Sequence, residues 1–128
     1  MKILLDTCTF LWIGIDAPEL SDTARAQFLD ENNEVYLSAV SAWEIAVKHT
    51  LGRLHLPDPL ERYIATRREQ HGIAPLPLDE AATLQLPKLP DWHRDPFDRM
   101  LICQAIAGTM AILTPDPQIA RYPIKTIW

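Results

Sequence analysis

Short apolar runs alternate with helix-forming segments along the whole chain, and this alternation constrains the fold more than any other feature. A chain that passes repeatedly from strand to helix to strand forms a mostly parallel sheet with helices on both faces. The sequence therefore predicts a three-layer α/β/α architecture around a mostly parallel sheet of four to five strands. The strands are expected at residues 2–5, 34–37, 73–78, 111–114 and 124–127, the third at a sheet edge because it contains two prolines.

The helical segments carry their own start and stop signals. Ser41 and Glu44 have the spacing of a capping box, and Asp58 and Asp95 each precede a proline, as N-cap residues often do. The segment that follows Ser41 is apolar over more than one face, which predicts contact with both the core and a partner chain. Helices are expected over residues 7–15, 21–30, 41–52, 58–72, 79–86 and 95–108, with a loop at 87–94.

Composition limits the class of protein. With 128 residues, 48% of them apolar and 23% charged, the chain is expected to form a single domain spanning residues 1–128 with one core. No apolar run approaches the ~20 residues that span a bilayer, and an acid at position 6 comes too early for a signal peptide. We therefore expect no membrane contact and a cytoplasmic location. Cys8 and Cys103 form no close-spaced metal motif and are predicted to be buried free thiols.

Acidic residues occur where the predicted strands end and the predicted helices begin. Asp6 follows the first strand and Asp116 follows the fourth, while Glu44 and Asp98 fall in first helical turns. Because the carboxyl ends of parallel strands meet at one edge of a sheet, these side chains are expected to converge there. The positive end of a helix near Asp98 would also lower its pKa.

Converging carboxylates imply a cation. At ~4 Å and an effective dielectric constant near 20, each pair repels by about 4 kcal/mol. A hard divalent cation relieves that repulsion, and oxygen ligands suit Mg²⁺ or Mn²⁺. The pattern therefore points to metal-assisted chemistry.

Most of these acids also have a purely structural explanation. Glu44 could complete the capping box, Asp95 could cap a helix with Asp98 as its partner, and Asp116 could begin a turn. Asp6 has no obvious local partner. Four such coincidences at one sheet edge are less economical than a single site, so the sequence favours a site.

The net charge of −5 does not exclude a nucleic-acid partner. The chain has 17 acids and 12 bases, and setting aside the proposed site acids together with Asp95 leaves as many acids as bases. Arginines such as Arg99 remain available for phosphate contacts.

Four segments that contain these acids share their order and spacing with a known family. They resemble PIN domains, and most of all the VapC-type toxins of bacterial toxin–antitoxin pairs. The segment Asp-Pro-Phe-Asp-Arg at 95–99 is the most specific part. The four segments are Leu4-Leu5-Asp6-Thr7, residues 38–45, residues 93–105 and Leu113-Thr114-Pro115-Asp116.

The resemblance implies an endoribonuclease that uses Mg²⁺ or Mn²⁺ to activate a water against an RNA phosphodiester bond. It also implies a homodimer and a complex with a VapB-like antitoxin. His93 has no role in that scheme and is expected to be a loop residue. The resemblance implies Asp6, Glu44, Asp98 and Asp116 as catalytic acids. The same four residues and Asp95 are the implied metal ligands. Thr7 and Thr114 would support these acids by hydrogen bonding, and Arg99 would contact substrate.

Two other classes of function stay open at the level of sequence. A phosphoacceptor signalling domain would also place acids at strand ends, but it expects adjacent acids near the N-terminus and a late lysine at the active edge. Asp6 has no acidic neighbour, and Lys125 is an imperfect candidate for that lysine. A non-enzymatic PIN-like binding module would be expected to lose acids, and this chain keeps them.

Overall fold

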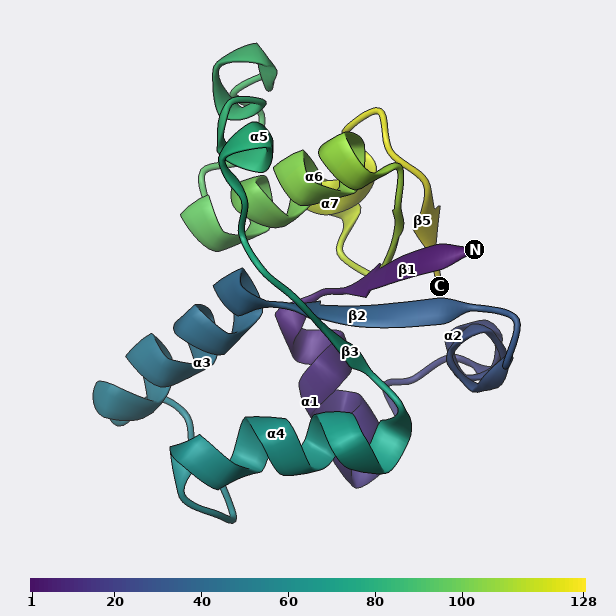
Figure 1. The fold of residues 1–128 in the computed structure, drawn as a ribbon, viewed down its shortest axis with the longest axis vertical. Helices are drawn as coiled ribbons and strands as arrows, with labels where there is room; N and C mark the ends of the chain where they lie inside the picture. The colour runs from purple at the N-terminus through teal and green to yellow at the C-terminus, as the bar shows by residue number, and fades with distance from the viewer.

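The computed structural model describes all residues from 1 to 128 as five strands, seven α-helices and one short 3₁₀ helix (Figure 1). The strands are β1 (Lys2–Leu5), β2 (Glu34–Ser38), β3 (Ala74–Leu76), β4 (Ala111–Leu113) and β5 (Thr126–Ile127). The helices are α1 (Thr7–Ile15), α2 (Asp22–Leu29), α3 (Ala39–Thr50), α4 (Leu60–His71), α5 (Glu80–Thr83), η1 (Leu86–Lys88), α6 (Pro96–Gly108) and α7 (Pro117–Ala120).

The five strands form one sheet in the order β3-β2-β1-β4-β5, and every pairing is parallel. Strand β1 lies at the centre, where Leu4 pairs with Tyr36 on one side and with Ile112 on the other. The proline-containing strand β3 lies at an edge, as its sequence predicts. The predicted parallel α/β sheet is confirmed, with five strands.

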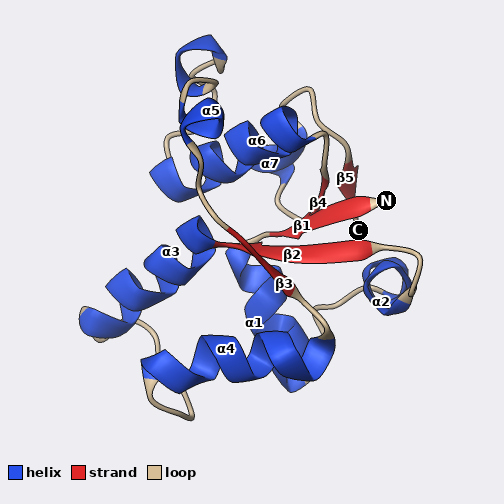
Figure 2. Ribbon diagram, viewed as in Figure 1, coloured by secondary structure: helices blue, strands red, loops and turns tan.

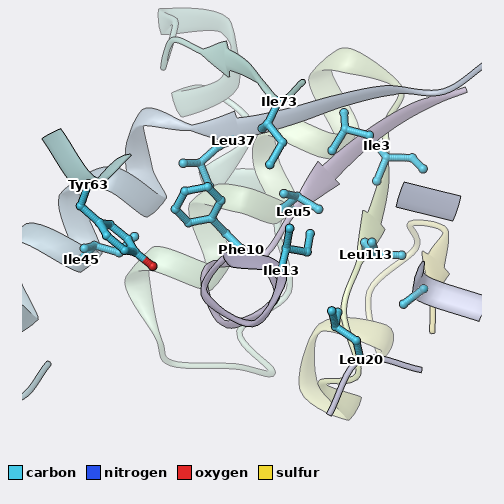
Figure 3. Close-up of a cluster of buried hydrophobic side chains, with 12 residues drawn as sticks. Ile3, Leu5, Phe10, Ile13, Leu20, Leu37, Ile45, Tyr63, Ile73 and Leu113 are labelled. Atoms are coloured by element: carbon cyan, nitrogen blue, oxygen red, sulfur yellow. The ribbon is translucent and has the colours of Figure 1, made fainter. Parts of the chain in front are cut away.

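Helices cover both faces of the sheet, because successive β1 side chains point to opposite sides. Ile3 and Leu5 pack into one buried cluster with Phe10 of α1 and Tyr63 of α4 (Figure 3). Leu4 packs into a second cluster built largely from α6, β4 and α7. Figure 2 shows α5, α6 and α7 on one side of the strands and α1, α2 and α4 on the other. The three-layer architecture is therefore confirmed.

The start of α3 differs from the sequence prediction. The N-cap is Ser38, whose Oγ accepts a 2.9 Å hydrogen bond from the Val40 amide. The prediction that Ser41 and Glu44 form a capping box at the start of this helix is therefore wrong. Ser38 is the last residue of β2, and its hydroxyl also donates to Gln104 on α6. The end of the strand therefore sets the start of the helix. Ser41 lies fully buried inside the first turns of α3.

Four smaller predictions are also corrected. Asp58 is exposed and caps nothing, because α4 begins at Leu60 after an extended Pro59 with no side-chain cap. Helix α7, which the sequence did not predict, follows Asp116, and η1 extends into the predicted loop. Cys103 is buried as predicted, whereas Cys8 is exposed.

No helix has the length and apolar character needed to cross a bilayer.

The corrected helix start gives a stability prediction. Ser38→Ala removes both the cap of α3 and the buried bond to Gln104, and should lower the free energy of unfolding by about 2 kcal/mol. The matched control is Ser21→Ala, which removes only the cap of α2 and should cost about 1 kcal/mol. Denaturant unfolding measures both. An equal cost for the two variants would contradict the cross-sheet role of Ser38.

Candidate metal centre

The carboxyl edge of the sheet brings the first pair of predicted residues together. Leu5 pairs with Leu113, so Asp6 and Thr114 are the residues that follow two neighbouring strands and lie side by side. The Thr114 hydroxyl donates a hydrogen bond to Asp6 Oδ2. Asp6 is only 6% exposed, and the predicted support from Thr114 is thus a direct contact.

Asp6 also has a local partner that its sequence context does not reveal. Its Oδ1 accepts a 2.7 Å hydrogen bond from the Thr9 amide, which makes Asp6 the N-cap of α1. Burial raises the pKa of Asp6, the hydrogen bonds from Thr114 and Thr9 oppose that rise, and the charge of Asp116 adds to it. The carboxylate is therefore held rigidly in a position where its charge is costly.

Glu44 approaches the same edge from the second turn of α3, one turn later than predicted. Its side chain is buried, with Oε1 accepting a 2.7 Å hydrogen bond from the Thr7 hydroxyl and Oε2 accepting one from Lys48. The hydrogen bond to Glu44 raises the pKa of Lys48. Thr7 thus contacts a site acid, as expected, and Lys48 supplies a positive charge beside it.

Asp95 and Asp98 lie at the start of α6. Asp95 is the N-cap, as predicted, and its Oδ1 accepts from the Asp98 amide at 3.0 Å. The Asp98 carboxylate does not complete that cap; its Oδ2 lies 2.8 Å from Nε2 of His93. Asp98 is therefore free for a role outside the helix.

The pKa of Asp98 moves opposite to the sequence expectation. Burial raises it to about 6, the hydrogen bond with His93 opposes the rise, and the charges of Asp95 and Glu44 increase it. Desolvation thus outweighs the favourable helix end. A carboxyl group whose charge is this poorly stabilised gains from a nearby cation.

Asp116 is the N-cap of α7, and its Oδ1 accepts from the Gln118 amide at 2.8 Å. Its own amide donates to the Thr114 hydroxyl at 3.0 Å, so Thr114 joins Asp116 to Asp6. The second oxygen of Asp116 is not used by the cap.

One compact group of potential ligands emerges from these elements. His93, Asp98 and Asp116 each offer an atom, and the three atoms all lie within 4.8 Å of one another. Asp6 lies beside Asp116, and Glu44 and Asp95 lie close enough to Asp98 for their charges to raise its pKa. Two carboxylates and an imidazole are donors that fit a divalent first-row cation.

Sequence reasoning missed His93, which was expected to be a loop residue without a role. Its only signal was its place five residues before Asp98, and a histidine in a loop carries no motif. Arg99, predicted to contact substrate, has its Nη1 2.9 Å from the Pro90 carbonyl and 3.2 Å from the His93 carbonyl. Arg99 therefore holds the loop that carries His93, and its contact with substrate stays a prediction.

Comparison with known proteins identifies the family. The family model of the PIN domain matches residues 3–125. The chain belongs to the PIN domain family. It is 40% identical over 115 residues to Ribonuclease VapC16 of Mycobacterium tuberculosis, an alignment that covers 87% of this PIN domain and 74% of that relative. The resemblance to VapC-type members is confirmed.

Solved structures show the same fold at low identity. VapBC2 from Rickettsia felis, bound to a DNA fragment from its promoter, matches with a TM-score of 0.73 and 13% identity, covering 98% of this PIN domain and 97% of that chain. DNA-bound VapBC from Salmonella typhimurium matches with a TM-score of 0.67 and 19% identity, covering 98% and 96%. These matches confirm the fold.

The raised pKa of Asp98 makes a prediction about stability. Between about pH 4 and pH 6 the folded protein keeps a proton on Asp98 that the unfolded chain has lost, so the free energy of unfolding falls as pH rises through that window. Asp98→Asn should remove this part of the decline. Denaturant unfolding in excess chelator across the window measures it.

The control for that experiment is Asp58→Asn, which changes an exposed aspartate outside the site and should keep the wild-type pH dependence. A pH dependence of Asp98→Asn that matches the wild type would contradict the raised pKa.

Proposed function

We propose that this PIN domain is a metal-dependent endoribonuclease and the toxin of a toxin–antitoxin pair. The observation that carries the proposal is the convergence of Asp98 and Asp116 at the carboxyl edge of the sheet, with Asp6 and Glu44 beside them. The 40% identity to a protein named as a ribonuclease supports RNA as the substrate.

The catalytic acids in this proposal are Asp6, Glu44, Asp98 and Asp116, and Asp95 adds a fifth carboxylate to the metal centre. A bound Mg²⁺ or Mn²⁺ would hold the scissile phosphate and lower the pKa of a water so that it attacks phosphorus. A carboxylate oxygen has two lone pairs, so the caps and hydroxyl contacts of these acids leave acceptor positions for a cation.

The remaining side chains position the acids. The Thr114 hydroxyl and the Thr9 amide each donate to one oxygen of Asp6. Thr7, in the same first turn of α1 as Thr9, donates to Glu44. The Lys48 side chain, which is 46% exposed, forms an ion pair with Glu44 and adds a positive charge at the site that can contact an RNA phosphate.

The proposal includes protein partners. A VapB-like antitoxin is supported by structural neighbours that are named as VapBC. A homodimer is the second assembly that the proposal includes. Trp43 of α3 is 57% exposed, and Leu51, the C-cap of α3, is 61% exposed, which supports a partner surface there. A toxin that cuts cellular RNA acts in the cytoplasm.

The geometry disfavours the phosphoacceptor alternative. Lys125 immediately precedes β5 and therefore lies at the amino edge of a parallel sheet, opposite the acids. A lysine there cannot contact a phosphorylated aspartate at the carboxyl edge.

The proposal predicts that the purified protein cleaves RNA only when Mg²⁺ or Mn²⁺ is present. Asp98→Asn and Asp6→Asn should each lower the cleavage rate by about 100-fold or more, because each removes a charge from the metal centre. The measurement is the rate of cleavage of total cellular RNA, with circular dichroism to show that each variant is folded.

The matched control is Asp58→Asn, which should cleave at the wild-type rate. Undiminished cleavage by folded Asp98→Asn, or by the wild type in excess chelator, would contradict the proposal. Metal binding without any cleavage would favour the non-enzymatic binding module.

A further inference from the structure

We propose that His93 is a nitrogen ligand of the divalent cation, so that the centre is a His–Asp–Asp site that binds Mn²⁺ in preference to Mg²⁺. The inference rests on the cation-binding part of the proposed function. It assigns a ligand that the acids at the strand ends do not predict.

The geometry of the three side chains fits one ion. His93 Nε2 lies 2.8 Å from Asp98 Oδ2, and Asp116 places an oxygen within 4.8 Å of both residues' ligand atoms. An octahedral ion with ligands at about 2.1 Å separates adjacent ligands by roughly 3 Å and opposite ligands by roughly 4 Å. The His93–Asp98 separation matches that of adjacent ligands, and the 4.8 Å limit on the Asp116 oxygen is less than about 1 Å beyond that of opposite ligands, so small side-chain movements bring the three atoms around one ion.

The ligand atoms are also available. Asp116 uses Oδ1 to cap α7 and keeps its other oxygen, and the only side-chain partner of the Asp98 carboxylate is His93 itself. As the structure stands, a hydrogen bond joins Nε2 and Oδ2. An ion that binds both atoms takes the place of that shared hydrogen.

Tyr122 and Arg99 hold the loop that carries His93 in place by hydrogen bonds. The Tyr122 hydroxyl accepts a 2.8 Å hydrogen bond from the His93 amide and donates at 2.9 Å to the Pro90 carbonyl, and Tyr122 is only 2% exposed. Arg99 donates to the His93 carbonyl from α6. Both backbone polar atoms of His93 are thus fixed, which is how a preorganised ligand is built.

The donor set determines the preferred ion. A site made only of carboxylates and water suits Mg²⁺, whereas an imidazole nitrogen suits first-row transition ions. Replacing one oxygen ligand with His93 therefore shifts the preference of the centre toward Mn²⁺. The competing explanation is that His93 only orients the Asp98 carboxylate by hydrogen bonding, as outer residues of metal sites do.

Pulsed electron paramagnetic resonance of bound Mn²⁺ separates the two explanations. A directly bound imidazole gives nitrogen modulation of the electron spin echo, and growing the protein with ¹⁵N-histidine changes that modulation. We expect the modulation in the wild type and its loss in His93→Gln. The control His55→Gln, at an exposed histidine outside the site, should keep it.

Calorimetric titration gives a second readout. His93→Gln should weaken Mn²⁺ binding by about tenfold or more and Mg²⁺ binding by a smaller factor. An equal loss for both ions would assign His93 to orienting Asp98 and overturn the proposal. If His93→Gln does not fold, the comparison of ¹⁴N-histidine and ¹⁵N-histidine wild-type protein decides, and the absence of any isotope effect overturns it.

The outcomes for the two proposals are distinguishable. Metal-dependent RNA cleavage without nitrogen modulation would overturn the His93 ligand and leave the nuclease. Histidine modulation in a protein that does not cleave RNA would support the ligand and contradict the nuclease.

Discussion

The buried carboxylate of Asp6 ties together three elements on which the site depends. It ends β1, it caps α1 through the Thr9 amide, and it accepts the Thr114 hydroxyl beyond β4. Burying a carboxylate is expensive unless strong hydrogen bonds replace its water, and charge-assisted bonds of this kind are the strong ones. The hydrogen bonds of Asp6 therefore help to fix both the direction in which α1 leaves the sheet and the alignment of β1 with β4 at the carboxyl edge.

Helix capping and metal binding are compatible uses of the same acids. Helices α1, α6 and α7 each begin at an acid of the site, namely Asp6, Asp95 and Asp116. A cap takes one hydrogen bond and leaves further lone pairs on the carboxylate. Capping also fixes the side chain against the backbone before any ion binds. The capping explanation and the metal-ligand explanation of these acids therefore do not exclude each other.

The sequence predicts the fold well because strand and helix signals alternate along the chain and the prolines of 73–78 fit only an edge. The sequence prediction fails where a contact between residues far apart in the chain determines the local structure. Ser38 and Ser41 are equally good capping residues, and only the pairing of β2 selects the first. His93 meets Asp98 because its loop rests on Tyr122, 29 residues further along. The Asp98 pKa depends on burial, which a helix position does not reveal.

The way each carboxylate is satisfied shows where a cation gains most. Asp6 has a hydroxyl and an amide as donors, and Glu44 has a hydroxyl and the Lys48 ammonium. Asp98 has one imidazole, and its pKa is raised to about 6 because that contact does not replace the water lost on burial. A cation that binds Asp98 supplies the missing stabilisation of its charge. Asp98, whose pKa is raised to about 6, rather than the more deeply buried Asp6, is therefore the acid that a cation in the proposed centre would stabilise most.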